Sequence, residues 1–183
     1  MSEPTFRQVD ERLVHQGFVV SFNVGTFEGP DGSTFDRDIV RHPGAVSVVP
    51  VDDDGQVVLV RQYRAVLDEF ILELPAGKLD IEGEDPMVCA QRELVEEVGI
   101  EASEWELLAS FHHSPGFCDE LGRVYLARGL TTVPDARQGI EEETMTIERR
   151  PLADAVALIA DGTIHDAKTC VGLLMARERL AAS

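Results

Sequence analysis

The chain has 183 residues, 44% of them hydrophobic, which suits one globular domain with a substantial buried core. Its formal net charge of −18 and its pI near 4.5 argue against binding to nucleic-acid phosphates or to anionic membranes, because both depend on an excess of basic residues. No apolar run approaches the roughly 18 residues of a membrane span, and the N-terminus lacks the basic-then-apolar order of a secretory signal. We therefore expect a cytoplasmic protein that binds small molecules.

The first third of the chain has the pattern of strands separated by turns. Strands are expected over residues 17–22 and 35–40, on either side of a Gly-Pro-Asp-Gly turn, so that they form an antiparallel hairpin. Two valine-rich strands, 45–51 and 57–63, are joined across an Asp-Asp-Asp-Gly turn of the kind that hairpins prefer. The sheet is expected to continue beyond this point.

A helix is expected over residues 86–98. Asp85 suits the N-cap, Pro86 suits the first helical position, and Gly99 suits the left-handed residue that ends a helix. Glu93, Glu96 and Glu97 fall within about a third of the helix circumference, and no lysine is placed to neutralise them. The opposite side carries much of the apolar content, namely Met87, Leu94, Val95 and Val98.

These three glutamates predict a metal site. Mg²⁺ and Mn²⁺ prefer oxygen ligands, and a bound cation would turn the repulsion between neighbouring carboxylates into affinity. The alternative is a solvated acidic helix, which is common in a chain with 34 acidic and 16 basic residues. Hydrolysis of a pyrophosphate suits several carboxylates with a divalent ion, because the substrate charge must be neutralised and a water activated.

After this helix, strands are expected over 105–111 and 123–126, and two helices over 151–159 and 166–180. No internal repeat, low-complexity tract or linker divides the chain. The pattern therefore predicts an α+β fold in which helices enclose a mixed sheet, with the antiparallel hairpin added at the N-terminus.

The order of residues around the acidic helix closely resembles the signature of the Nudix hydrolases. The matching positions are Gly77, Glu84, Arg92-Glu93-Leu94, Glu96-Glu97 and Gly99-Ile100. The family pattern has five residues between its glycine and its first glutamate, whereas six residues separate Gly77 from Glu84 here.

The resemblance implies a Nudix-type α/β/α sandwich that cleaves a nucleoside diphosphate linked to another moiety, using Mg²⁺ or Mn²⁺. It also implies roles for residues of the motif. Glu93 and Glu97 would be the main metal ligands, Glu96 a third, and the carbonyl of Ala76 a further oxygen ligand. Arg92 would be a structural partner that holds the glutamates.

Segments outside the motif resemble the ADP-ribose pyrophosphatase branch of the family, particularly its actinobacterial members. These segments are Leu74-Pro75-Ala76-Gly77, Ser114-Pro115-Gly116-Phe117 and a later glutamate-rich loop. The resemblance implies hydrolysis of ADP-ribose to AMP and ribose 5-phosphate. The alternatives are hydrolysis of another nucleoside diphosphate sugar, such as GDP-mannose or UDP-glucose, and a sensor that binds ADP-ribose without cleaving it. The sensor ranks last, because such a domain would be expected to lose its metal-binding glutamates.

The glutamate-rich loop contains Glu141, Glu142 and Glu143. Three consecutive glutamates in so acidic a chain are more often a solvated loop than part of an active site. Related enzymes bring a glutamate from a late loop over the metal, so the resemblance favours a catalytic role. We predict Glu142 as the general base, and the sequence does not separate it from its two neighbours.

Positive charge for binding phosphate is scarce in this chain. Arg61 and Arg64 lie at the end of an expected strand, and a guanidinium binds phosphate oxygens in a bidentate manner. Arg64 is favoured, whereas Arg61 could equally cap an exposed sheet edge. Arg41 and Phe117 are further candidates for substrate binding.

We expect a single Nudix domain over residues 1–183. Within it, residues 1–42 would supply N-terminal strands for dimerisation and residues 43–183 would form the catalytic core. The resemblance implies a homodimer, because relatives commonly pair through such strands.

Overall fold

The computed structural model describes residues 5–136 and 142–182 and divides into two compact units. The described part of the first unit covers residues 5–44 and His112–Leu121. The second unit covers Ala45–Phe111 and, in its described part, 122–136 and 142–182. No helix in these described ranges combines the length and apolar character needed to cross a membrane.

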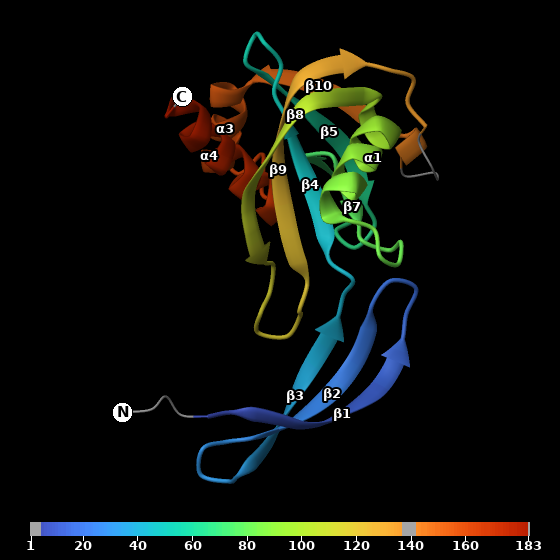
Figure 1. Ribbon diagram of the computed structural model, residues 1–183, viewed down its shortest axis with the longest axis vertical. Coiled ribbons are helices and arrows are strands. Elements are labelled where there is room, and N and C mark those ends of the chain that lie inside the picture. The colour runs from blue at the N-terminus through green and yellow to red at the C-terminus, as the bar shows by residue number, and fades with distance from the viewer. Residues whose placement is uncertain (1–4, 137–141, 183) are drawn as a thin grey trace. The chain divides into compact units, whose positions relative to one another are not determined.

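The first unit is built on an antiparallel sheet of three strands, β1 (Arg7–Gln16), β2 (Ser21–Glu28) and β3 (Thr34–Arg41), in the order β1-β2-β3 (Figure 1). The 112–121 segment joins the end of β3. There the amide of Val40 donates to the carbonyl of Phe117 at 2.7 Å, and the amide of Asp119 donates to the carbonyl of Val40 at 3.2 Å.

Two details of the expected hairpin are wrong. A third strand, β1, precedes it. Every residue of β1 is exposed, and its sequence lacks the apolar alternation by which a half-buried strand is recognised. The expected strand 17–22 is mostly the turn between β1 and β2, in which the amide of Gly17 donates to the carbonyl of Val20 at 2.9 Å. A side chain at Gly17 would crowd that same carbonyl, so the turn depends on glycine.

The second unit contains two sheets. One has the order β10-β5-β6, and the other, which is mixed, has the order β7-β4-β9-β8 with β4 and β9 parallel. The strands are β4 (Ala45–Pro50), β5 (Gln56–Arg64), β6 (Glu69–Glu73), β7 (Ala76–Lys78), β8 (Ile100–His112), β9 (Leu121–Thr132) and β10 (Thr146–Pro151). The helices are α1 (Pro86–Val98), α3 (Leu152–Ala160) and α4 (Ala167–Ala181).

Alternation along the strands creates two apolar cores. On β5, Val57 and Leu59 pack in a cluster with Leu173 of α4, whereas Val58 and Val60 pack in a second cluster with Leu94 of α1. Figure 1 shows α1 on one side of the strands and α3 and α4 on the other. The layered α+β arrangement with a mixed sheet is thereby confirmed.

The later helices agree closely with the sequence prediction, while three strands of the second unit were not anticipated. Asp166 caps α4 by accepting from the amide of Thr169 at 3.0 Å. The unanticipated strands are β6, β7 and β10, which are short or rich in charged residues. Two of them, β6 and β7, immediately precede the acidic helix in the order of elements.

Candidate active site

The helix α1 begins and ends where its sequence predicts. The carboxylate of Asp85 accepts from the amide of Met87 at 2.8 Å, and Pro86 occupies the first helical position, where its missing N–H is no loss. Gly99 adopts a φ of 62° and donates to the carbonyl of Val95 at 3.0 Å, which ends the helix. The buried residues of the helix are Cys89, Ala90, Leu94, Glu97 and Val98. One carboxylate therefore lies on the packed side.

Arg92 gathers three of the motif's glutamates. Its Nε and Nη2 donate to the two carboxylate oxygens of Glu84 at 3.0 and 3.1 Å. Its Nη1 donates to Glu93 at 2.8 Å and to Glu96 at 3.0 Å. The bidentate contact lowers the pKa of Glu84, so this carboxylate stays charged and anchors the loop before α1 to the helix. These contacts are those of a residue that holds the glutamates in place.

Glu93 and Glu97 lie against the start of β7. The amide of Ala76 donates to Oε2 of Glu97 at 3.0 Å. A Cβ added at Gly77 would overlap the carboxylate of Glu93, so only glycine allows the two groups to approach this closely. The first residues of β7 and the glutamates of α1 therefore form one cluster.

The two buried carboxylates of this cluster have raised pKa values. Burial raises the pKa of Glu97 to about 8, and the nearby charges of Glu93 and Glu142 act in the same direction, against the Ala76 hydrogen bond and the charge of Arg64. Burial likewise raises the pKa of Glu93, and Arg92 opposes that rise. Such a cluster of buried carboxylates would be stabilised by a cation.

Glu142 is electrostatically part of the cluster, although it comes from the late loop. Its charge raises the pKa of both Glu93 and Glu97, and its side chain is partly buried. Glu143 is exposed, and Glu141 lies outside the described residues.

The donor set fits a hard divalent cation such as Mg²⁺ or Mn²⁺, because carboxylate oxygens predominate. In the part of the chain that the structure describes, no three Asp, Glu, His or Cys side chains already form a ready-made metal-binding group. Glu93 and Glu96 are engaged with Arg92, and Glu97 is engaged with Ala76.

Of the two arginines on β5 that were predicted to bind phosphate, Arg64 is the one that lies near the glutamates of α1. Its charge lowers the pKa of Glu97, and the charge of Glu97 in turn contributes to a raised pKa of Arg64, whose main cause is hydrogen bonding to Glu73. Arg61 has the opposite parity on β5 and shares its face with Leu59, which packs on the α4 side. It donates to Glu148 of β10 at 2.9 Å, so the structure does not bring it to the glutamates.

Arg41 and Phe117 belong to the first unit. Arg41 donates to Glu11 at 3.0 Å and to Asp119 at 2.9 Å, and these hydrogen bonds raise its pKa. The side chain of Phe117 is 55% exposed. Their predicted contact with substrate stays a prediction.

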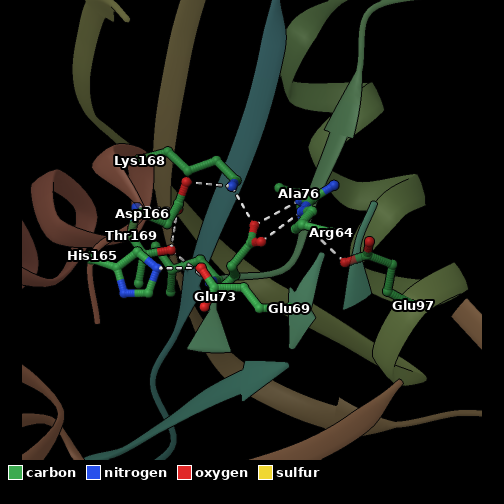
Figure 2. A network of polar contacts seen from close by, with 10 residues as sticks. Arg64, Glu69, Glu73, Ala76, Glu97, His165, Asp166, Lys168 and Thr169 are labelled. Atoms are coloured by element: carbon green, nitrogen blue, oxygen red, sulfur yellow. Dashed lines mark hydrogen bonds and ion pairs between the residues drawn. The ribbon is translucent and has the colours of Figure 1, made fainter. Parts of the chain in front are cut away.

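Sequence reasoning missed a polar network that surrounds Arg64. Figure 2 shows Glu73 between Arg64 and Lys168, with Asp166 and Thr169 beyond. Two signals in the sequence could have revealed it. Glu73 interrupts an apolar run, and Lys168 lies in the first turn of a helix, where the dipole disfavours a cation.

Gln62 was also missed. It is 5% exposed and shares the face of β5 with Val60 and Arg64, and its Nε2 has no hydrogen-bond partner among the described residues. A buried donor of this kind is uncommon in a folded protein.

Comparison with known proteins identifies the family. The model of the NUDIX domain matches residues 41–169, which include β7, α1 and the residues that surround them. The chain belongs to the Nudix family. It is a Nudix pyrophosphatase, and enzymes of this family use a divalent metal.

Two relatives cover nearly the whole chain. A methanol dehydrogenase activator of Bacillus methanolicus is 42% identical over 167 residues, which are 91% of this chain and 90% of the relative. An ADP-ribose pyrophosphatase of Mycobacterium tuberculosis is 38% identical over 174 residues, which are 95% of this chain and 84% of the relative.

The fold is shared with a solved structure of an ADP compounds hydrolase, with a TM-score of 0.82 at 24% identity. The match covers 100% of this chain and 96% of that chain. The Nudix fold expected from the sequence is thereby confirmed.

Proposed function

We propose that this Nudix enzyme hydrolyses the pyrophosphate bond of ADP-ribose and releases AMP and ribose 5-phosphate, with Mg²⁺ or Mn²⁺ as the metal. The observation that carries the proposal is the cluster of Glu93 and Glu97 against Ala76 and Gly77, with the charge of Glu142 within reach. The likeness to an ADP-ribose pyrophosphatase over 95% of the chain supports the choice of substrate.

The carboxylates of Glu93 and Glu97 would hold the cation, and Glu96 and the carbonyl of Ala76 would be further oxygen donors. When bound, the metal supplies positive charge that offsets the pyrophosphate and lowers the pKa of a bound water. Arg92 keeps Glu93 and Glu96 oriented through its Nη1 contacts. Gly77 allows Glu93 to reach the start of β7.

Two side chains would act on the substrate and on the attacking water. Glu142 is the proposed general base, because its partly buried carboxylate lies within electrostatic reach of both Glu93 and Glu97. Arg64 is the proposed phosphate-binding residue, because it is the arginine of β5 whose charge lowers the pKa of Glu97.

A substrate panel with Mg²⁺ tests the proposal. ADP-ribose, GDP-mannose and UDP-glucose would each be incubated with the protein, and the products would be separated by anion-exchange chromatography. We expect AMP and ribose 5-phosphate from ADP-ribose at a kcat/KM well above that for the other two. A clear preference for GDP-mannose or UDP-glucose would show that the proposed substrate is wrong and that the proposed pyrophosphate hydrolysis is right. Tight binding of ADP-ribose without turnover would instead show a sensor.

Three expectations from the sequence remain predictions alongside this function. They are the homodimer formed through the N-terminal strands, the role of residues 43–183 as the catalytic core of a single domain, and the cytoplasmic location. Gel filtration coupled to light scattering would test the first of them.

A further inference from the structure

Glu73 is a fully buried carboxylate placed beside the active site. It lies at the end of β6, with 0% of its surface exposed, and accepts from Nε of Arg64 at 2.6 Å and from Nη2 at 2.7 Å. The ammonium of Lys168 also contacts its Oε2. The two oxygens of Glu73 thus receive three charge-assisted hydrogen bonds, which are roughly twice as strong as neutral ones.

The network continues into the first turn of α4. Lys168 pairs with Oδ1 of Asp166 at 2.9 Å, while Oδ2 of Asp166 accepts from the amide and the hydroxyl of Thr169 at 3.0 and 2.6 Å. The hydroxyl oxygen of Thr169 in turn accepts from the amide of Leu74 at 3.0 Å. The start of α4 is therefore bonded both to Glu73 and to the backbone just before β7.

Charge within the network is balanced. Arg64 and Lys168 offset Glu73 and Asp166, and Lys168 and Thr169 hold the pKa of Asp166 below its ordinary value although burial opposes this. Stability alone does not explain such an arrangement, because well-packed apolar side chains often stabilise a protein as well as a buried ion pair does. A functional explanation is available in the position of Arg64.

Arg64 is the member of the network that reaches the glutamates. Figure 2 shows its guanidinium bonded to the carboxylate of Glu73, and its charge lowers the pKa of Glu97. Two of its nitrogens are fixed by Glu73, which sets the plane of the guanidinium, and its side chain is 38% exposed. A guanidinium fixed along one edge is preorganised to bind phosphate through its other N–H groups, because the side chain loses little rotational freedom on binding.

We propose that Glu73 and Lys168 are positioning residues that hold Arg64 for contact with the substrate's pyrophosphate. Glu73 fixes the arginine directly, and Lys168 fixes Glu73 from the start of α4. The inference rests on the proposed function, in which Arg64 binds phosphate.

Steady-state kinetics on Glu73→Gln tests the direct contact. Glutamine keeps the shape of the Glu73 side chain, but it replaces one accepting oxygen with an NH2 group. This group would face the N–H donors of Arg64 or Lys168, so the guanidinium of Arg64 would no longer be held in one plane. We expect KM for ADP-ribose to rise about tenfold while kcat stays within about threefold, because a contact made equally in the ground state and the transition state is lost. A purely structural role would instead reduce the amount of active enzyme, and so kcat, with KM unchanged.

A double-mutant cycle identifies the residue through which Glu73 acts. In an Arg64→Ala background, Glu73→Gln should change KM by less than about twofold, because the partner it positions is gone. An undiminished tenfold effect in that background would overturn the inference. The matched control is Glu104→Gln, which breaks an exposed contact of 2.7 Å with Arg128 and should leave both constants at the parent values.

Lys168 supplies a second test, should Glu73→Gln fold poorly. Lys168→Met should raise KM by about threefold to tenfold, and Lys168→Arg, which keeps the charge, should restore most of the loss. Equal KM values for the parent, Lys168→Met and Lys168→Arg would remove Lys168 from the proposal.

A spectroscopic readout separates this inference from the proposed function. In ¹H–¹⁵N spectra, the Nε–H of Arg64 should exchange slowly with solvent in the parent and rapidly in Glu73→Gln. Unchanged exchange would show that Glu73 does not fix the arginine, whatever the substrate. A parent that hydrolyses no nucleoside diphosphate sugar, but shows this difference in exchange, would overturn the proposed function and leave the fixed guanidinium in place.

Discussion

Replacing Glu97 with glutamine is expected to stabilise the metal-free protein above neutral pH while it removes activity. Burial raises the pKa of Glu97 from an ordinary 4.5 to about 8, so the folded state binds this proton more tightly than the unfolded state does. The contribution of Glu97 to stability therefore falls as the pH rises from about 4.5 to about 8. At about 1.4 kcal/mol for each pH unit, the full rise corresponds to at most about 5 kcal/mol in the free energy of unfolding.

Glu97→Gln removes this ionisation and keeps an oxygen that can accept from the amide of Ala76. Even a third of the full effect, about 1.5 kcal/mol, would raise Tm by about 3–6 °C in a chain of this size. The same change removes a proposed metal ligand, so turnover should fall by at least about a hundredfold. Stability and activity are thus expected to change in opposite directions.

Thermal unfolding followed by circular dichroism in the presence of EDTA would measure the effect at about pH 5, 7 and 9. The difference in Tm between Glu97→Gln and the parent should be small at the lowest pH and grow as the pH rises. Added Mg²⁺ should raise the Tm of the parent more than that of the variant. A Tm difference that is flat across this range, or a variant as active as the parent, would refute the reasoning.

Three further results are expected. EDTA should abolish hydrolysis and added Mg²⁺ or Mn²⁺ should restore it, because the Glu93 and Glu97 carboxylates alone would repel a pyrophosphate; full activity in metal-free buffer would contradict the mechanism. Glu142→Gln should lower the single-turnover rate by about 10²–10⁴-fold with little change in substrate binding, whereas the exposed Glu143 should tolerate the same change. A larger loss at Glu143 would move the general base to that residue. Gly77→Ala should lower kcat/KM by about a hundredfold with a small change in Tm, because its Cβ displaces only the flexible end of Glu93. Parent-like kinetics in that variant would show that the close approach is not needed.

The acidic helix could be predicted almost residue by residue because its signals are local. A cap at Asp85, a proline at the first position and a glycine with positive φ after the last turn each act within a few residues. The prediction that all three glutamates lie on the side opposite the packed apolar residues was less accurate, because Glu97 is buried. Its depth depends on β7 lying against α1, which is a contact between segments distant along the chain.

Contacts over long sequence separations explain most of what the sequence did not reveal. The roles predicted for Arg61 and Arg64 differed only slightly, yet strand parity directs one to Glu148 of β10 and the other to Glu73 of β6. That difference depends on the register of β5 with both of its neighbours. Neither β6 nor β10 carries the apolar alternation by which a strand is recognised from sequence.

The two arginines beside the cluster, Arg92 and Arg64, act on different glutamates. Arg92 compensates Glu84, Glu93 and Glu96, all within reach of a single guanidinium. Glu97 accepts from the amide of Ala76, and the charge of Arg64, whose guanidinium is held by Glu73, reaches it as well. The pKa of this deeply buried carboxylate is raised because burial outweighs the hydrogen bond from Ala76 and the charge of Arg64. If a divalent cation binds here as proposed, the burial and mutual repulsion that raise the pKa values of Glu93 and Glu97 would lower the stability of the metal-free fold and favour metal binding at the same carboxylates.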